Sequence, residues 1–401
     1  MATRTNHVIV VGAGLSGLAC ALYLSSTGRE VTVLEQRGMP GGRHGTLELD
    51  GFRFDTGPAL PLPPEAIAAP LHAVGERLRD WIEFLPLDPI CRAYYPDGTS
   101  LDVSSDPHRT AAAIGALCGG REARAYLRYL KAAAYRVPVE MFFNDPRTLR
   151  LFGSALLFGF SVLGSPWHPR GGIHAVPRAL AMVAEKRGVN LRFDSRVHAW
   201  ETRGNRVTAV HTTEGERLTA DAFIFPAGRV GPAKGPSHLV IHLGGQASYE
   251  KIAHHNLHFG KPWIRSTHQV LVRGELMSDP TVLVSNPSRT DPTAGRHTYQ
   301  VVVPVPNLKS APLDWDGPAT RAYSGEILAT LEARGYLDLG VGLTTSYVVT
   351  PADWSRQGMP YGIPHSPTKR PSRLHSALGN VVIAGPGLDA GRTAAEKVVG
   401  V

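Results

Sequence analysis

The sequence contains few cysteines and no long hydrophobic run. Cys20, Cys91 and Cys118 are the three cysteines, and none of them lies in a CxxC pattern. An odd number at these spacings indicates neither a disulfide framework nor a zinc site, and it fits a reducing cytoplasm. The longest apolar stretch, residues 151–164, has 14 residues, whereas a membrane-spanning helix needs about 20. This stretch is therefore expected to form a buried helix or an interfacial helix that collects an apolar substrate.

Signals for export and for nucleic-acid binding are also missing. The first residues lead directly into an apolar strand, without the basic, apolar and small-residue order of a signal peptide. The net charge is +8, but no run of five or more basic residues occurs. We therefore expect no nucleic-acid partner. The excess charge fits a weak attraction to an anionic membrane surface better, so we expect a cytoplasmic protein that can associate with the inner face of a membrane.

Hydrophobic residues, by contrast, make up 43% of the 401 residues. A chain of this length and composition can bury a substantial core. It is more typical of two domains, or of one domain with a large insertion, than of one small unit.

Residues 8–35 have the order of a nucleotide-binding unit. The β-branched run at 8–11 is typical of a buried parallel strand, and the turn GAGLSG at 12–17 and a helical pattern follow it. A second strand over 30–34 ends at Glu35, where a carboxylate can accept a hydrogen bond from a ribose hydroxyl. The alternative is a glycine-rich turn in an unrelated α/β sheet. The acid at the expected distance favours a dinucleotide site.

In this interpretation each glycine of the turn has a separate structural role. Gly12 permits the tight turn, Gly14 lets the backbone approach a pyrophosphate, and Gly17 lets the helix pack closely on the strand. The N–H groups at the start of the helix would then point at phosphate.

Residues 39–45, MPGGRHG, indicate which dinucleotide is bound. This second glycine loop follows the acid-bearing strand directly and carries Arg43. A nicotinamide site does not need such a loop, whereas a guanidinium can neutralise a diphosphate with two parallel hydrogen bonds. The sequence therefore predicts FAD as the cofactor.

The motifs EQR at 35–37, GGR at 41–43 and LDGFRFDTGP at 49–58 resemble the opening of the FAD-dependent amine-oxidase and phytoene-desaturase superfamily. Residues 237–263, 279–306 and 347–354 resemble, more specifically, the actinobacterial phytoene desaturases. The resemblance covers nearly the whole chain. It implies dehydrogenation of a linear apolar polyene in carotenoid biosynthesis by hydride transfer to flavin, with quinone or oxygen as the final electron acceptor.

The fold implied is α/β. A Rossmann-like FAD-binding domain, with a parallel sheet and a hairpin layer, would carry an inserted α+β substrate domain. We expect the FAD domain to comprise residues 1–62, 169–228 and 376–401. The substrate or membrane-facing domain would comprise residues 63–168 and 229–375.

The resemblance also implies roles for individual residues. Glu35 would bind the adenosine ribose, Arg43 the diphosphate, and Val197 the adenine through its backbone, while Gly57 would lie near the isoalloxazine. The complete set of expected cofactor-binding residues is Gly12, Ala13, Gly14, Ser16, Gly17, Glu35, Gln36, Arg37, Gly42, Arg43, Gly57, Val197, Gly385 and Gly387.

A catalytic group and a metal site are harder to predict. Arg170, in a PRGG loop beside the expected cavity, is the candidate catalytic residue; the alternative is a structural pair with a carboxylate.

His254, His255 and His258 have spacings that a helix could bring together as metal ligands. Their flanks read as strand and no acidic residue accompanies them, so we expect hydrogen-bonded histidines and no metal.

Three segments are shorter than in the family. Between the last strand and the last helix, which is expected over 391–399, relatives carry a longer TxPGxGxP loop where this chain has only residues 387–391. The helical region between 147 and 167 and the connection at 226–235 are also short. The cofactor expectation does not depend on these segments, but turnover does. A soluble amine-oxidase-like flavoenzyme and a flavin- or apolar-ligand-binding protein without turnover therefore remain as alternatives.

Overall fold

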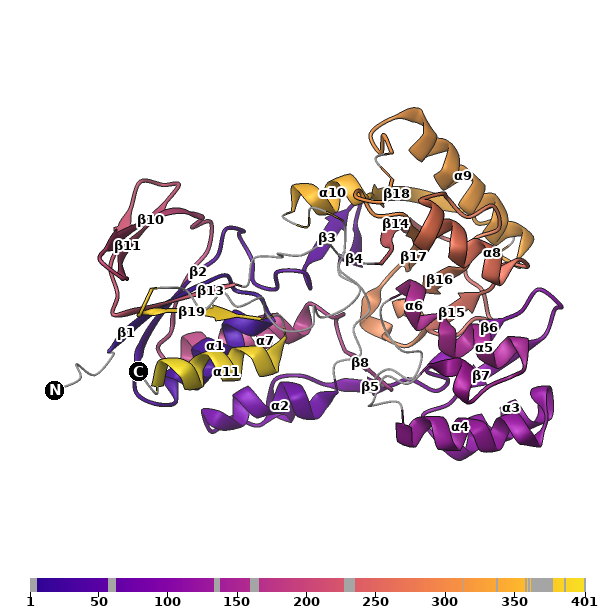
Figure 1. Ribbon diagram of the computed structural model, residues 1–401, viewed down its shortest axis with the longest axis horizontal. Coiled ribbons are helices and arrows are strands. Elements are labelled where there is room, and N and C mark those ends of the chain that lie inside the picture. The colour runs from indigo at the N-terminus through magenta and orange to yellow at the C-terminus, as the bar shows by residue number, and fades with distance from the viewer. Residues whose placement is uncertain are drawn as a thin grey trace.

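The structure is a computed structural model that describes residues 6–56, 63–132, 138–158, 166–226, 235–311, 313–336, 338–357, 359, 361, 378–385 and 387–399. Figure 1 shows two units, one built on a parallel sheet and one on a larger mixed sheet, with the chain crossing between them several times. Gly57 lies outside the described residues, so its expected place near the flavin stays a prediction.

The first unit is built on a five-stranded sheet in which every pair is parallel. Its apolar strands are buried on both faces, as parallel sheets require. In spatial order they are β19 (Val381–Ala384), β13 (Ala222–Pro226), β1 (His7–Val11), β2 (Glu30–Leu34) and β9 (Asn190–Arg192).

Two layers cover this sheet. One face packs against α1 (Leu15–Ser25), α7 (Ala175–Lys186) and α11 (Leu388–Val399). The other face meets an antiparallel layer of β10 (Val197–Arg203), β11 (Arg206–Thr212) and β12 (Arg217–Leu218), with Ile9 and Phe223 fully buried between the two sheets. The expected Rossmann-like domain with a hairpin layer is therefore confirmed.

Two elements cross the expected boundaries. The helix α2 (Pro64–Ala73) packs on α1 and α11 and buries Ile67 and Leu71 in their core, so it belongs to the first unit although the expected boundary lies before residue 63. The hairpin of β3 (Thr46–Leu49) and β4 (Phe52–Asp55) reaches the second unit. There a Cβ on Gly244 would lie 2.6 Å from the ring of Phe52, so only glycine fits.

The second unit is built on a seven-stranded sheet. Its neighbouring strands are antiparallel except β15 and β6. In spatial order they are β18 (Leu343–Val349), β14 (Ser237–Gly245), β17 (His297–Val305), β16 (Val282–Ser285), β15 (His255–His258), β6 (Cys91–Tyr94) and β7 (Ser100–Val103).

Helices lie on both faces of this sheet. The core on one face includes residues of α3 (Pro107–Cys118), α4 (Gly120–Ala132), α5 (Pro146–Gly153) and α6 (Ala155–Phe158). The core on the other face includes residues of α9 (Pro318–Ala333). The short elements are β5 (Phe84–Pro86), which pairs with β8 (Trp167–Pro169), and the helices α8 (Trp263–His268) and α10 (Pro351–Arg356). The expected α+β unit is present.

The apolar stretch 151–164 is described as far as residue 158, at the end of α6. Leu151, Phe152 and Leu157 are fully buried in the core of the second unit, so this half of the stretch is internal. Within the described ranges, every helix is too short or too polar to cross a membrane.

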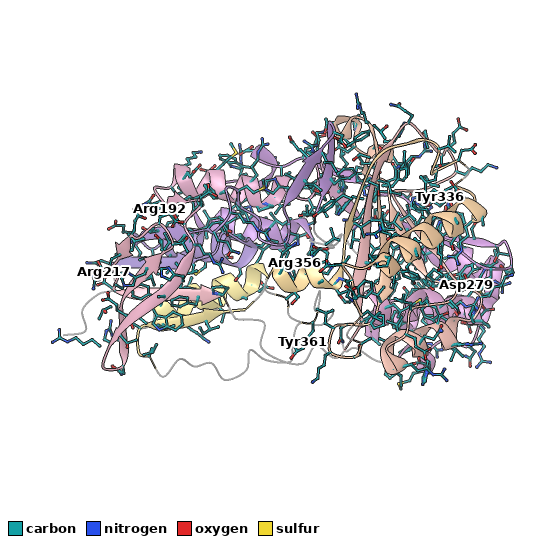
Figure 2. The ribbon with its side chains drawn as sticks, turned by 90° about the horizontal axis from the view of Figure 1, so that it is seen from above. Arg192, Arg217, Asp279, Tyr336, Arg356 and Tyr361 are labelled. Carbon is teal, nitrogen blue, oxygen red and sulfur yellow. The ribbon has the colours of Figure 1, made fainter. Side chains whose placement is uncertain are left out.

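The helix α10 connects the two units. Arg356 at its end pairs with Asp316 and Asp353, and Figure 2 shows it between Arg192 and Arg217 of the first unit and Tyr336 of the second. The next residue, Gln357, accepts a hydrogen bond of 3.3 Å from Arg37. The loop after β2 is therefore tied to the second unit.

Candidate functional site

The N-terminus of α1 offers unsatisfied hydrogen-bond donors. Gly14 is the N-cap, and no side chain caps the helix. The hydroxyl of Ser16 in the first turn is buried and has no hydrogen-bond partner among the described residues. Free N–H groups and a hydroxyl at a helix N-terminus form a binding site for an anion.

Two glycine loops meet at this helix end. A Cβ on Gly17 would lie 1.9 Å from the carbonyl oxygen of Gly12, so the helix can start this close to the strand only with glycine. Gly42, at φ 59°, faces Gly14 across the loops, and a Cβ on Gly42 would lie 3.2 Å from the Gly14 Cα. Gly41 donates its N–H to the carbonyl of Ala13 at 2.9 Å. The two loops therefore form one cradle of bare backbone, as a diphosphate site requires.

Glu35 lies at the end of β2, beside this cradle. Its carboxylate is buried and accepts hydrogen bonds from the N–H of Ala13 at 2.7 Å and the N–H of Arg37 at 3.0 Å, one on each oxygen. Each carboxylate oxygen has a second acceptor position, so both remain able to accept from a ribose. Gln36 is exposed, and its expected contact with the cofactor stays a prediction.

The two arginines of this region differ. Arg37 donates to the carbonyl of Gly42 at 2.7 Å and holds the second loop in place. Arg43 has no ion pair or hydrogen bond within the described part of the chain, and burial lowers the pKa of its guanidinium. A partly buried cation without a counter-ion is costly. The diphosphate of FAD would supply the missing charge, so the residues present fit this cofactor.

His44 was not predicted as a site residue, although it follows Arg43 directly. Its side chain is buried, and its Nε2 lacks a partner in the described part of the chain. Burial, helped by the charge of Arg43, lowers the pKa of His44 to about 4. It is therefore a neutral polar group at the edge of the cradle.

Val197 begins β10 and is brought to the same end of the sheet as Glu35. The N–H of Ser195 donates to the Glu35 carbonyl at 2.8 Å, and the N–H of Asp194 donates to the Arg37 carbonyl at 3.1 Å. Val197, two residues further, packs against the core between the two sheets.

Gly385 and Gly387 lie between β19 and α11, as predicted. The helix, however, begins at Leu388 and not at Gly391. The connection is so short that residues 388–391 already form the first turn. Gly391, which sequence reasoning did not select, lies against α1 in a space where a Cβ would come within 2.3 Å of the Ser16 carbonyl oxygen.

Asp55 joins the hairpin β3–β4 to the loop before α7. Its carboxylate accepts a hydrogen bond from the N–H of Ile173 at 3.0 Å. Gly172, at φ 90°, has no room for a side chain, because a Cβ there would lie 2.8 Å from a carboxylate oxygen of Asp55. Burial raises the pKa of Asp55, and the Ile173 N–H and nearby His168 oppose this shift. Sequence reasoning missed this residue because Ile173 is 118 positions away.

Arg170 forms a two-pronged ion pair with Glu83, with distances of 2.6 and 2.9 Å. This is the structural pair with a carboxylate that was considered as the alternative to catalysis. The catalytic role of Arg170 stays a prediction.

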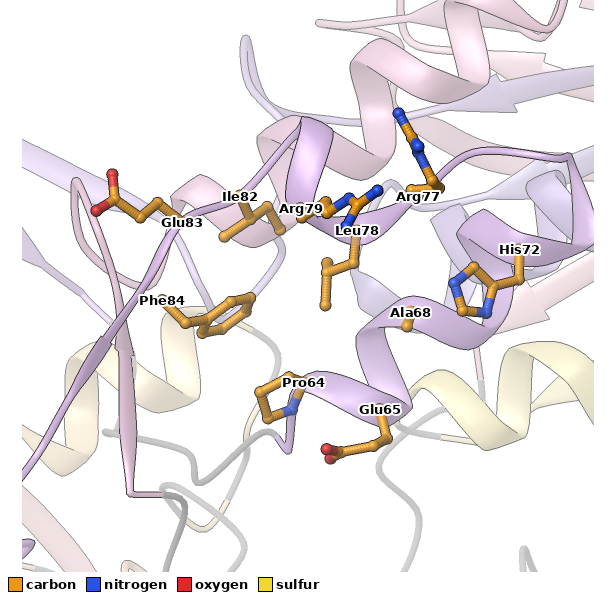
Figure 3. A pocket seen from close by; sticks show the side chains of 10 residues that line it. All are labelled: Pro64, Glu65, Ala68, His72, Arg77, Leu78, Arg79, Ile82, Glu83 and Phe84. Carbon is orange, nitrogen blue, oxygen red and sulfur yellow. The ribbon is translucent and has the colours of Figure 1, made fainter.

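Glu83 also lines a surface pocket of about 750 Å³, shown in Figure 3 between α2 and β5. The apolar residues that line this pocket are Pro64, Ala68, Leu78, Ile82 and Phe84.

The three clustered histidines do not lie on a helix. His255 and His258 are in β15, and His254 precedes it. Their partners are hydroxyl groups: Thr290 for His254, Ser285 for His255 and Tyr336 for His258. In the described part of the chain, no group of three or more potential ligands could hold a metal ion.

Comparisons with known proteins agree with this geometry. A family model described as FAD dependent oxidoreductase matches residues 7–248. Phytoene dehydrogenase from Streptomyces griseus is 33% identical over 98% of this chain and 95% of its own length. A zeta-carotene-forming phytoene desaturase from Myxococcus xanthus is 28% identical over 96% of this chain and 90% of its own length. Among solved structures, an oxidoreductase from Methanosarcina mazei, with 15% identity and a TM-score of 0.65, covers 98% of this chain and 100% of its own, and thus shares the fold.

The comparison with the Streptomyces protein also bears on chain length. Its alignment extends over 485 positions, whereas this chain has 401 residues. The relative therefore has segments without a counterpart in this chain. That these segments correspond to the three places expected above stays a prediction.

Proposed function

Because the chain belongs to the FAD-dependent oxidoreductases, and among them to the phytoene dehydrogenases and desaturases, we propose that it dehydrogenates a linear apolar polyene of the phytoene type. The observation that carries this proposal is the cradle at the start of α1, where the Ser16 hydroxyl and the Arg43 guanidinium lack partners among the described residues. A diphosphate at this point satisfies both. The substrate class, a phytoene-type polyene, is inferred from the relatives, a phytoene dehydrogenase and a phytoene desaturase.

The chain's own residues bind and orient the cofactor in this proposal. The N-terminus of α1, Ser16 and Arg43 hold the diphosphate, and Glu35 accepts hydrogen bonds from the adenosine ribose. Gly14 and Gly42 leave the space for this contact. When bound, the flavin takes up a hydride from the substrate.

The substrate would lie between the units. We propose that the first unit, including α2, is the FAD domain and that the mixed sheet with its helices is the substrate domain. A hydrocarbon chain would be held there by burial of its apolar area, which is the main attraction available to such a ligand.

The decisive experiment combines a spectrum with a bleaching assay. The purified protein is examined for a flavin spectrum and then mixed anaerobically with phytoene in liposomes. We expect bleaching of the flavin with phytoene and the appearance of a more conjugated product. Bleaching by amines alone would support the amine-oxidase-like alternative, and a coloured but inert protein would support ligand binding without turnover.

For the electron acceptor we propose quinone or oxygen. Protein reduced by phytoene is mixed with a soluble quinone or with air-saturated buffer, and the return of the flavin spectrum is timed. Faster return with the quinone identifies it as the acceptor, and faster return with air identifies oxygen.

We further propose a cytoplasmic protein that associates with a membrane surface. Support comes from three apolar side chains with large exposed fractions: Met141 (71%), Ile264 (83%) and Val272 (67%). Ile264 and Val272 lie in α8 and the turn that follows it. The exposed basic residues of this segment are Lys261, Arg265 and Arg273. Apolar side chains flanked by cations are typical of interfacial binding.

Sedimentation with anionic vesicles tests this association. Ile264→Asp should reduce the bound fraction. Val341→Asp, at an equally exposed position before β18, serves as the control and should not. Equal binding of both variants and the wild type would contradict the proposal.

A further inference from the structure

The loop before α7 has contacts with both units. The N–H of Gly171 donates to the carboxylate of Asp291 in the second unit at 2.6 Å. The N–H of Ile173 donates to Asp55, 3.0 Å from each carboxylate oxygen. Asp55 ends β4, and its backbone carbonyl accepts a hydrogen bond from Gln300 of β17 at 3.0 Å. Two carboxylates from distant parts of the chain therefore fix this loop.

Asp55 also caps the N-terminus of α7. His174 is the N-cap residue of this helix, and its own side chain makes no capping hydrogen bond. Instead, the Asp55 carboxylate accepts a long hydrogen bond of 3.5 Å from the His174 N–H, besides the shorter one from Ile173. A carboxylate at a helix N-terminus satisfies N–H groups that the helix leaves free. The backbone of His174 is thus held in place, and its side chain is available for another contact.

The imidazole of His174 contacts the second glycine loop, residues 39–45. Its Nε2 lies 2.9 Å from the carbonyl oxygen of Pro40 and donates to it, because a carbonyl oxygen can only accept. The Cδ2 atom of the ring is close to Gly41, where a Cβ would lie 3.3 Å from it. His174 therefore contacts two neighbouring residues of a loop that lies more than 130 positions earlier in the chain.

The residues that His174 contacts border the diphosphate cradle. Gly41 pairs with Gly14 in a parallel β-bridge, and Gly42 faces the Cα of Gly14. Arg37 donates to the carbonyl of Gly42 at 2.7 Å. The second loop is thus held by Arg37 from its own segment and by His174 from α7. A loop that is fixed before FAD arrives does not have to be ordered during binding, which favours binding.

We propose that His174 is a positioning residue for FAD, because it holds Pro40 and Gly41 so that the second glycine loop is in place before the diphosphate binds. This inference rests on the proposed function. Asp55 acts one step further away, since it fixes the N-terminus of α7 that carries the His174 ring. Neither side chain has to touch the cofactor or the substrate for this role.

The first test compares His174→Leu, which lacks a donor, with His174→Gln, whose amide can still donate to the Pro40 carbonyl. Flavin-free protein is titrated with FAD, and fluorescence quenching gives the dissociation constant. We expect the affinity of His174→Leu to fall by about three- to tenfold, the usual effect of losing one hydrogen bond. His174→Gln should bind nearly as the wild type does. Wild-type affinity in His174→Leu, or an equal loss in both variants, overturns the inference.

His7→Leu is the matched control. His7 is also half-buried and bonds Thr32 through its Nε2 at 3.0 Å, but it begins β1, at the end opposite to the glycine turn. Both leucine variants lose one hydrogen bond of an imidazole, so their thermal unfolding midpoints without FAD should fall by similar amounts. Only His174→Leu should lose affinity for FAD. An equal loss in His7→Leu would mean that destabilisation alone weakens binding, which contradicts a positioning role.

The bleaching rate separates positioning from catalysis. When FAD saturates the protein, phytoene should bleach His174→Leu anaerobically at the wild-type rate, because the bound cofactor then holds the loop. A slower rate at saturation, with unchanged FAD affinity, would contradict the inference. A wild type that binds FAD but is not bleached by phytoene contradicts the proposed function and leaves the inference standing. A wild type that binds no FAD overturns both.

Asp55→Ala tests the more distant step. Alone, it should weaken FAD binding by about as much as His174→Leu does. Because both side chains act through the same contact with Pro40, the double variant should lose less affinity than the sum of the two single losses. Fully additive losses would show that Asp55 acts independently of His174, and would overturn this step.

Discussion

Gly391 of α11 packs directly on the backbone of Ser16 in α1, so closely that a Cβ on Gly391 would come within 2.3 Å of the Ser16 carbonyl oxygen. The last helix of the described chain is thus fixed to the first turn of the helix that faces the diphosphate cradle. A side chain added at this contact would push against the first turn of α1, which borders the cradle.

We expect Gly391→Ala to weaken FAD binding and to lower the free energy of unfolding by about 1–3 kcal/mol, the usual result of adding a methyl group to a filled space. Flavin retained after gel filtration and the urea midpoint measure the two effects. The matched control is Gly325→Ala in α9, where a Cβ meets nothing within 4 Å and should stabilise by about 0.5–1 kcal/mol. Normal flavin retention in Gly391→Ala would contradict this role of the contact.

Arg43→Ala should reduce the affinity for FAD by about tenfold or more, because in the proposed site the guanidinium would form charge-assisted hydrogen bonds to the diphosphate. The protein without FAD should be no less stable than the wild type, since Arg43 has no partner among the described residues. Titration of the flavin-free protein with FAD, followed by fluorescence quenching, measures the affinity. Arg321→Ala, at an exposed position of α9, should bind FAD normally.

Arg170→Gln should change the bleaching rate only slightly, far less than the roughly 10²-fold loss expected for a proton-transfer group. The reason is that the Nε and Nη2 of Arg170 both donate to the carboxylate of Glu83, the arrangement of a structural ion pair. Glu83→Gln should have the same small effect. A large loss in Arg170→Gln with no loss in Glu83→Gln would instead support a catalytic Arg170.

Acid should destabilise this protein well before its carboxylates are protonated. Burial lowers the pKa of His44 to about 4 and the pKa values of His255 and His258 to about 3, from an ordinary value of 6.5. Because these pKa values are lower in the folded protein, the unfolded protein takes up protons first as the pH falls. The stability that the protein has with neutral histidines is therefore fully present above pH 6.5 and is lost as pH falls towards 4. Each histidine contributes up to about 1.4 kcal/mol per pH unit in this window.

Urea midpoints at pH 7, 6 and 5 check this expectation. We expect a steady fall, and a shallower fall for His258→Gln, which has one fewer titrating group. A midpoint independent of pH between 7 and 5 would show that these imidazoles are hydrated in the folded protein.

The sequence predicts the first unit well because its signals are local. The strands at His7–Val11 and Glu30–Leu34 and the helix between them follow from an apolar run, a glycine turn and helical periodicity. FAD follows from GGR at 41–43 and from the family resemblance. These features depend on residues that are close together in the chain.

The cross-strand pairs of the mixed sheet and the Asp55–Ile173 contact could not be predicted in this way. Register between strands far apart in the chain is set by tertiary packing, so no local pattern places His242 beside Gln300 and Tyr347. The start of α11 was missed because the connection after β19 is so short that residues 388–391 already form the first turn of the helix.

The order of strands in the parallel sheet has a consequence for synthesis. The strand β19, from residues 381–384, pairs with β13, which in turn pairs with β1 near the start of the chain. Contacts across so many residues form slowly, and the sheet stays incomplete until the residues of β19 have been synthesised. Until then the outer edge of β13 has no partner strand, and an unpaired strand edge is open to pairing with another chain.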